Sequence, residues 1–187
     1  MISAVLFDFY GVFQPDPYII WLKKHDLEPS KGFSNLVTQL DHNKIDRTAF
    51  LHHLGTALGR VVTYQEIYGS SPPALTEEVI KIATELKNNY RVGLLSNASR
   101  HLRPRLTEEG IIDLFDAITI SSEVGISKPH PDIYITALAQ LKAAPEQTLY
   151  IDDNPDYVTA ARSLGVASIQ FTDSTQLRNE LSQYNLL

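Results

Sequence analysis

Ala4-Val5-Leu6-Phe7-Asp8-Phe9-Tyr10-Gly11-Val12, near the start of the 187-residue chain, is an apolar run that ends at an acid and a glycine. Four consecutive apolar residues before Asp8 predict a strand that is buried on both faces, as the strands of parallel sheets are. Asp8 would then lie at the carboxyl end of this strand, where open parallel sheets bind their ligands.

Strands and helices alternate along most of the remaining chain. The expected strands are Val92–Leu95, Ala117–Ile120, Thr148–Ile151 and Ala167–Phe171. The expected helices are Glu77–Lys87 with Thr76 as its cap, one opened by Pro131, one opened by Asn154-Pro155, and one opened by Asp173 with Gln176 in a capping box. This alternation predicts an α/β fold with a doubly wound parallel sheet.

The segment from Gln14 to Pro73 departs from the alternation, because it has helical patterns and no good strand run. Asp16-Pro17 is an N-cap and first-turn pair typical of a helix start, and Pro72-Pro73 looks like a linker back to the core. We therefore expect residues 14–73 to form a small helical domain inserted after the first strand. Residues 1–13 and 74–187 would form the α/β core.

The amino-acid composition argues against several classes of binding partner and of functional site. The formal charge is −6, from 22 acidic and 16 basic residues, with no basic cluster of the kind that nucleic acids or membrane surfaces require. The chain has no cysteine, which excludes disulfides, thiolate zinc sites and a cysteine nucleophile. It shows no signal peptide at its start and no apolar run long enough to span a membrane, so we expect a cytoplasmic protein.

Polar side chains gather at the predicted strand ends. They are Asp8, the pair Ser96-Asn97 and the pair Asp152-Asp153, and Lys128 lies in the loop before the helix opened by Pro131. A parallel sheet would bring these groups into one crevice. Carboxylates, a hydroxyl and a lysine together suit a phosphate and an oxygen-loving divalent cation such as Mg²⁺.

These segments also resemble the four motifs of the haloacid dehalogenase superfamily, in the order that the family has them. The matching stretches are Asp8-Phe9-Tyr10-Gly11-Val12, Leu94-Leu95-Ser96-Asn97, Lys128-Pro129 and Ile151-Asp152-Asp153. The resemblance implies a Rossmann-like core, and the expected helical insertion falls where the family carries its small helical cap. It also implies a hydrolase, in particular a Mg²⁺-dependent phosphatase of a small phosphorylated metabolite.

The resemblance assigns a role to each residue of the candidate site. Asp8 would be the nucleophile that forms an aspartyl phosphate, and Lys128 would neutralise its charge and that of the phosphate. Ser96 and Asn97 would bind the phosphoryl group. The ligands of Mg²⁺ would be Asp8, Asp152, Asp153 and the backbone carbonyl of Tyr10.

Tyr10 is the departure from the phosphatase pattern, which has a second aspartate there as general acid and base. Its loss should lower turnover by roughly 10²–10⁴-fold for leaving groups that need a proton. The 2-haloacid dehalogenases resemble this chain in having Asp-X-Tyr-Gly, but they continue with threonine where Val12 stands. They also lack the acidic pair, which would repel a haloacid carboxylate.

Two further readings stay open beside the phosphatase. One is a dehalogenase-like enzyme, and the other is a catalytically weak or silent protein that binds phosphate for regulation. His130 is a conceivable substitute for the missing acid and base, but we expect it to be a surface or helix-capping residue. We expect Tyr18 and Trp21 to pack within the insertion rather than to bind substrate.

Overall fold

The computed structural model describes residues 1–27, 31–41, 44–69 and 73–187. Parts of the expected insertion therefore lie outside the described residues, namely 28–30, 42–43 and 70–72. The first proline of the expected Pro72-Pro73 linker is among them.

A parallel sheet forms the centre of the molecule. Its described strands are β1 (Ala4–Phe7), β2 (Arg91–Ser96), β3 (Ala117–Ile120), β4 (Thr148–Asp152) and β5 (Ala167–Gln170), in the spatial order β3-β2-β1-β4-β5. Every neighbouring pair is parallel. The doubly wound α/β prediction is therefore confirmed, with the apolar β1 at the centre as its sequence indicated.

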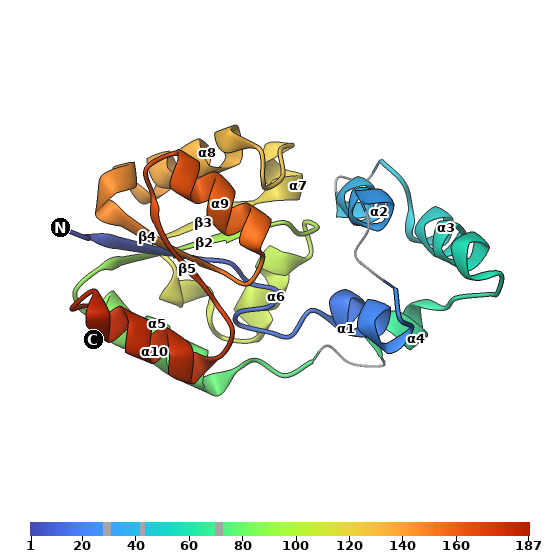
Figure 1. The fold of residues 1–187 in the computed structure, drawn as a ribbon, viewed down its shortest axis with the longest axis horizontal. Coiled ribbons are helices and arrows are strands. Elements are labelled where there is room, and N and C mark those ends of the chain that lie inside the picture. Colours follow the sequence, from blue (N-terminus) through green and yellow to red (C-terminus); the bar gives the residue numbers. More distant parts are fainter. Residues whose placement is uncertain (28–30, 42–43, 70–72) are drawn as a thin grey trace.

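Helices cover both faces of this sheet (Figure 1). On one face lie α5 (Glu77–Lys87) and α10 (Ser174–Gln183), and on the other lie α8 (Pro131–Leu141) and α9 (Pro155–Ser163). Each face has its own apolar cluster, which buries the strand side chains that point toward it. The shorter elements are α6 (Leu102–Glu108), α7 (Ser121–Val124) and the 3₁₀ turns Ile112–Leu114 and Pro145–Gln147.

The helix caps follow the sequence except at Thr76. The side chain of Asn154 accepts a hydrogen bond from the N–H of Asp156, and Asp173 accepts from the N–H groups of Thr175 and Gln176. Thr76 was expected to cap α5, but its side chain makes no capping bond. Its N–H donates to the carbonyl of Phe13 at 2.7 Å, which ties the returning chain to the segment after β1.

The described part of the chain between β1 and α5 forms four helices. They are α1 (Pro17–Lys24), α2 (Lys31–Asp41), α3 (Arg47–Leu58) and α4 (Tyr64–Tyr68). Figure 1 shows them together on the side of the core where β1 ends. They share a separate apolar cluster around Trp21, Leu22, Phe50 and Leu54. Of the helices described here, none has both the length and the apolar character needed to cross a membrane.

Candidate active site

The site begins where β1 and β4 end side by side. Asp8 directly follows β1, and its N–H donates to the carbonyl of Ile151 at 2.9 Å, which fixes it beside the end of β4. Asp152 is the last residue of β4, and Asp153 comes next. Carboxylate oxygens of Asp8, Asp152 and Asp153 lie within 4.8 Å of one another, so three residues from distant parts of the sequence meet at one point.

Lys128 lies buried among these acids. Its Nζ is 2.9 Å from Oδ2 of Asp8 and 2.7 Å from Oδ2 of Asp152, and its side chain is 0% exposed. The loop that carries it is held by Asn97, whose side chain accepts from the N–H of Lys128 at 2.8 Å and donates to its carbonyl at 3.0 Å. The amide of Asn97, expected to bind substrate, is thus engaged in placing Lys128.

Two tyrosines that the sequence did not single out complete the surroundings of Lys128. Its Nζ donates to the hydroxyl of Tyr150 at 3.1 Å, and that hydroxyl donates to Oδ2 of Asp152. Its Nζ also lies 4.8 Å from the ring centroid of Tyr157. Tyr150 precedes Asp152 by two residues, so the alternation of strand side chains puts both on one face of β4.

Negative charge exceeds positive charge in this cluster. Burial raises the pKa of Asp8 well above its ordinary value; Lys128 opposes this, and Asp152 and Asp153 add to it. Burial and the charge of Asp152 likewise raise the pKa of Asp153 to about 6. Burial lowers the pKa of Lys128, but Asp152 and Asp8 outweigh it, so the pKa is raised and Lys128 stays cationic. Three carboxyl groups thus share one ammonium group, and this shortage of positive charge adds to the effect of burial on the pKa of Asp8 and of Asp153.

This donor set fits a divalent cation. It consists of oxygen ligands alone, which is what Mg²⁺ prefers, and a bound cation would balance the excess of negative charge. Gly11 makes room for one of the carboxylates. It has a φ of +86°, and a Cβ at this position would lie 2.3 Å from Cγ of Asp153. Only glycine therefore allows the observed placement of Asp153.

The hydroxyl of Ser96 is a buried polar group that is available to a ligand. Its side chain is fully buried at the end of β2, and its Oγ has no hydrogen-bond partner within the described part of the chain. Leaving a buried hydroxyl unpaired costs about 1–3 kcal/mol. A ligand oxygen at this strand end would recover that energy.

Tyr10 lies half-buried at the border of the site. Its ring meets that of Phe9 edge to face, with centroids 5.0 Å apart. Burial raises the pKa of Tyr10 to about 12, although the charge of Arg105 opposes the shift. The hydroxyl therefore keeps its proton at neutral pH and is unsuited to act as a general base.

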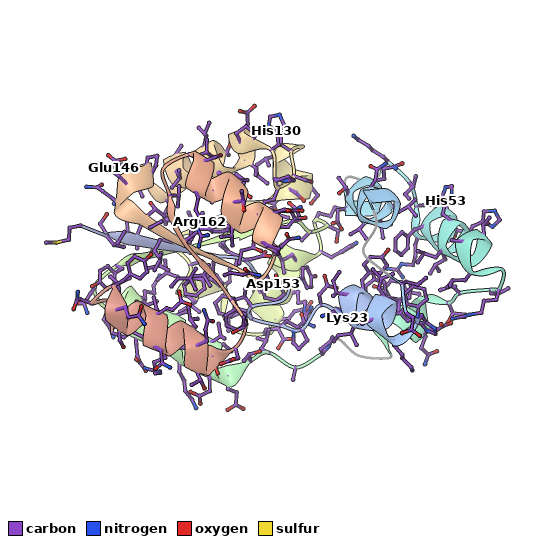
Figure 2. The ribbon with its side chains drawn as sticks, viewed as in Figure 1. Lys23, His53, His130, Glu146, Asp153 and Arg162 are labelled. Atoms are coloured by element: carbon purple, nitrogen blue, oxygen red, sulfur yellow. The ribbon has the colours of Figure 1, made fainter. Side chains whose placement is uncertain are left out.

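His130 has the capping role expected of it. Its Nδ1 accepts from the N–H of Asp132 at 3.3 Å at the start of α8, and its side chain is 58% exposed. Figure 2 shows His130 on the outer surface of the core, whereas Asp153 lies on the side that faces α1. His130 is thus not placed to assist Asp8.

A cavity of about 660 Å³ adjoins the site between the core and the helices that follow β1. Tyr10 and Asn97 form the part of its wall nearest the site, and the helices α1, α2, α3, α4 and α6 with the loops beside them contribute the rest. Tyr18 lines it as well. The expectation for Trp21 is confirmed, because it packs in the apolar cluster of the insertion, but Tyr18 packs there and also borders the cavity.

Comparison with known proteins identifies the family of this chain. The sequence profile of the haloacid dehalogenase-like hydrolases matches residues 2–165. The D-ribitol-5-phosphate phosphatase of Bacteroides thetaiotaomicron is 25% identical over 97% of this chain and 98% of its own length.

Solved structures share the fold. One is a haloacid dehalogenase family enzyme of Bacteroides thetaiotaomicron in complex with magnesium and inorganic phosphate, with a TM-score of 0.66, 20% identity and coverage of 95% and 99% of the two chains. Another is the L-2-haloacid dehalogenase of Xanthobacter autotrophicus, with a TM-score of 0.65, 21% identity and coverage of 100% and 85%. The chain described here belongs to the haloacid dehalogenase-like hydrolases.

Proposed function

We propose that this hydrolase is a Mg²⁺-dependent phosphatase that acts on a small phosphorylated metabolite. The observation that carries the proposal is the buried Lys128 between Asp8 and Asp152, in a carboxylate cluster with an excess of negative charge. A haloacid would bring a further carboxylate into this cluster without relieving the excess. A phosphate ester that enters with a divalent cation brings positive charge that balances the carboxylates of the cluster.

Each side chain then has a part in the transfer. A carboxylate oxygen of Asp8 attacks phosphorus, and the bond from phosphorus to the ester oxygen breaks, so the alcohol leaves and takes up a proton. Water then attacks the phosphorus of the aspartyl phosphate, which releases inorganic phosphate and restores Asp8. Lys128 holds the attacking carboxylate in place, and the hydroxyl of Ser96 donates to a phosphoryl oxygen.

The cation would be held by Asp8, Asp152, Asp153 and the backbone carbonyl of Tyr10. Bound there, Mg²⁺ would neutralise charge on the phosphoryl oxygens. Asn97 acts chiefly through Lys128, because both polar ends of its side chain bind the backbone of that residue.

The cavity supports a small substrate. Its volume of about 660 Å³ lies within the usual range for small-molecule sites. Residues 14–73 would serve as a cap that covers the reacting groups and excludes water. The ribitol phosphate phosphatase of Bacteroides thetaiotaomicron, which matches nearly the whole chain, supports a phosphorylated metabolite as substrate.

The proposal is tested by the wild-type protein with an aryl phosphate. We expect phosphate release that depends on Mg²⁺ and stops on chelation, because an aryl leaving group needs little help from a general acid. Halide release from 2-haloacids without added metal would instead support the dehalogenase reading, which Tyr10 favours. Tight binding of a phosphate analogue without turnover would identify a silent phosphate-binding protein.

Replacing Tyr10 with aspartate is expected to raise turnover of alkyl phosphates by roughly 10²-fold, because it supplies a proton-exchanging group. Aryl phosphates should gain less, since their leaving groups need no proton. The matched control is Tyr10→Asn, which has the shape of aspartate but exchanges no proton. If kcat/KM for alkyl phosphates rises equally in both variants, the gain comes from removing the tyrosine ring and not from proton exchange by the aspartate.

Gly11→Ala is expected to displace Asp153 and to raise the Mg²⁺ concentration for half-maximal activity by about tenfold or more. The reason is the Cβ contact of 2.3 Å with Cγ of Asp153. Gly110→Ala is the control, because Gly110 has a similar φ of +70° and a Cβ there would meet nothing within 4 Å. If both variants have the same Mg²⁺ requirement, the position of Asp153 is irrelevant to metal binding.

A further inference from the structure

The wall of the cavity is acidic and aromatic on the side of the insertion. Asp16, at the start of α1, and Asp41, at the end of α2, both line it. The tyrosines of this wall are Tyr10, Tyr18, Tyr64 and Tyr68. Carboxylates and the faces of tyrosine rings both attract cations.

Among the residues whose side chains the structure describes, no lysine, arginine or histidine forms an ion pair with Asp16 or Asp41. Asp16 accepts hydrogen bonds from the N–H groups of Tyr18 and Ile19 as the N-cap of α1. Burial and the charge of Asp16 raise the pKa of Asp41 to about 7. Near neutral pH a proton therefore occupies part of the Asp41 carboxylates, and a ligand cation could take its place.

Arg47 and Arg105, which also line the cavity, each contact other protein groups. The guanidinium of Arg47 lies over the ring of Tyr64, 3.8 Å from its centroid. Arg105 donates to the carbonyl of Pro73 and lies 3.7 Å from the carboxylate of Glu109. Its Nε is buried without a hydrogen-bond partner in the part of the chain that the structure describes.

Two deeply buried polar groups of this wall also have no hydrogen-bond partner among the described residues. Gln14 is 1% exposed, and its Nε2 donates to the carbonyl of Pro73 at 3.0 Å, but its Oε1 accepts nothing within the described chain. Tyr18 is 4% exposed, and its hydroxyl is likewise unpaired. Both residues line the cavity. A ligand that donates several hydrogen bonds would satisfy them.

We propose that this cavity binds a primary ammonium group on the alcohol part of the substrate, so that the enzyme hydrolyses amino-alcohol phosphate esters. The inference rests on the proposed phosphatase function, whose reacting groups adjoin the cavity at Tyr10 and Asn97. The ammonium group donates to Asp41 and to Oε1 of Gln14. Its charge compensates the pair formed by Asp16 and Asp41.

A neutral polyol fits this wall less well. Its hydroxyls could donate to the same acceptors, but they would bring no positive charge to the half-buried carboxylates of Asp16 and Asp41. An ester with an anionic end would add a third negative charge to the pair. Among esters of equal size, the carboxylates of Asp16 and Asp41 therefore favour the one whose far end carries an ammonium group.

The test compares esters that differ only in their far end. Phosphoethanolamine, propyl phosphate and phosphoglycolate end in an ammonium, a methyl and a carboxylate group, and glycerol-1-phosphate represents the polyols. We expect wild-type kcat/KM for phosphoethanolamine to exceed that of each of the others by about tenfold or more. Equal or higher values for any of them would overturn the inference.

The variant Asp41→Asn keeps the shape of the side chain and removes its charge. It should reduce the ratio of kcat/KM between phosphoethanolamine and propyl phosphate by about tenfold. The matched control is Asp113→Asn, which removes the same charge at an exposed position outside the cavity and should keep the ratio. An unchanged ratio in Asp41→Asn would overturn the assignment of Asp41.

A binding measurement separates this inference from the proposed function. Calorimetry with Asp8→Asn and Mg²⁺ should give the same order, with phosphoethanolamine bound more tightly than propyl phosphate. If an aryl phosphate is hydrolysed but the two esters bind equally, or phosphoethanolamine does not bind, the phosphatase proposal stands and the ammonium site fails. If phosphoethanolamine binds more tightly than propyl phosphate but no phosphate ester is hydrolysed, the ammonium site stands and the phosphatase proposal fails.

Discussion

Asp8→Asn is expected to lower phosphate release by roughly 10⁴-fold or more for every ester, because the amide cannot form an acyl phosphate. The effect should be the same for aryl and alkyl phosphates, since it removes the bond-forming atom and not the assistance to the leaving group. Initial rates at saturating Mg²⁺ check this. Turnover within tenfold of the wild type would mean that another group attacks phosphorus.

The loss should not come from unfolding. Burial raises the pKa of Asp8 well above its ordinary value despite Lys128, so ionised Asp8 lowers the stability of the metal-free fold as pH rises through that pKa. A neutral asparagine of the same shape avoids this effect, and Lys128 still pairs with Asp152. The metal-free variant should thus unfold in urea at a concentration no lower than the wild type does.

Lys128→Met is expected to destabilise the protein by about 3–5 kcal/mol, because it leaves Asp8 and Asp152 buried without their cation. The lysine side chain is 0% exposed, so water cannot replace it. Activity should fall as well, since Asp8 loses the contact that holds it. Urea unfolding of the metal-free protein measures the change in stability.

Two companion variants separate the buried pair from lysine replacement in general. Lys81→Met removes a lysine that pairs with Glu78 where both side chains are more than half exposed, and it should change stability little. Adding Asp152→Asn to Lys128→Met removes one of the unpaired charges and should restore part of the lost stability. A double variant less stable than Lys128→Met would show that unpaired charge is not the cause.

The strand ends of the site could be predicted from the sequence, for a general reason. Parallel strands end at one edge of a sheet, so Asp8 and Asp152 had to meet once their apolar runs were recognised as neighbouring strands. Lys128 was harder to place, because it lies on a loop, and only its resemblance to a family motif indicated where it would lie.

Other parts of the site depend on contacts that no local pattern records. The two hydrogen bonds between the side chain of Asn97 and the backbone of Lys128 join residues 31 positions apart. Thr76 has the sequence of a helix cap, but its backbone is bound to Phe13, so tertiary structure prevails over local preference. Tyr150 could have been found, because it shares a strand face with Asp152.

The cavity wall was beyond prediction for the same reason. Asp16 was recognised as a helix cap, and it is one, but its nearness to Asp41 arises from the tertiary packing of the helices between β1 and α5. Tyr18 was assigned to the apolar core of the insertion, and its ring is there, while its hydroxyl is left unpaired. Helical periodicity identifies the buried face of a helix and does not show what lies at its edge.

The most direct test of the central claim is mass spectrometry of the wild-type protein, quenched in acid within the first turnover of an aryl phosphate with Mg²⁺. The account predicts a mass increase of one phosphoryl group, located on the peptide that contains Asp8 and absent without Mg²⁺ or in Asp8→Asn. Phosphate release at full rate with no phosphorylated peptide, or with the phosphoryl group on another residue, would contradict it.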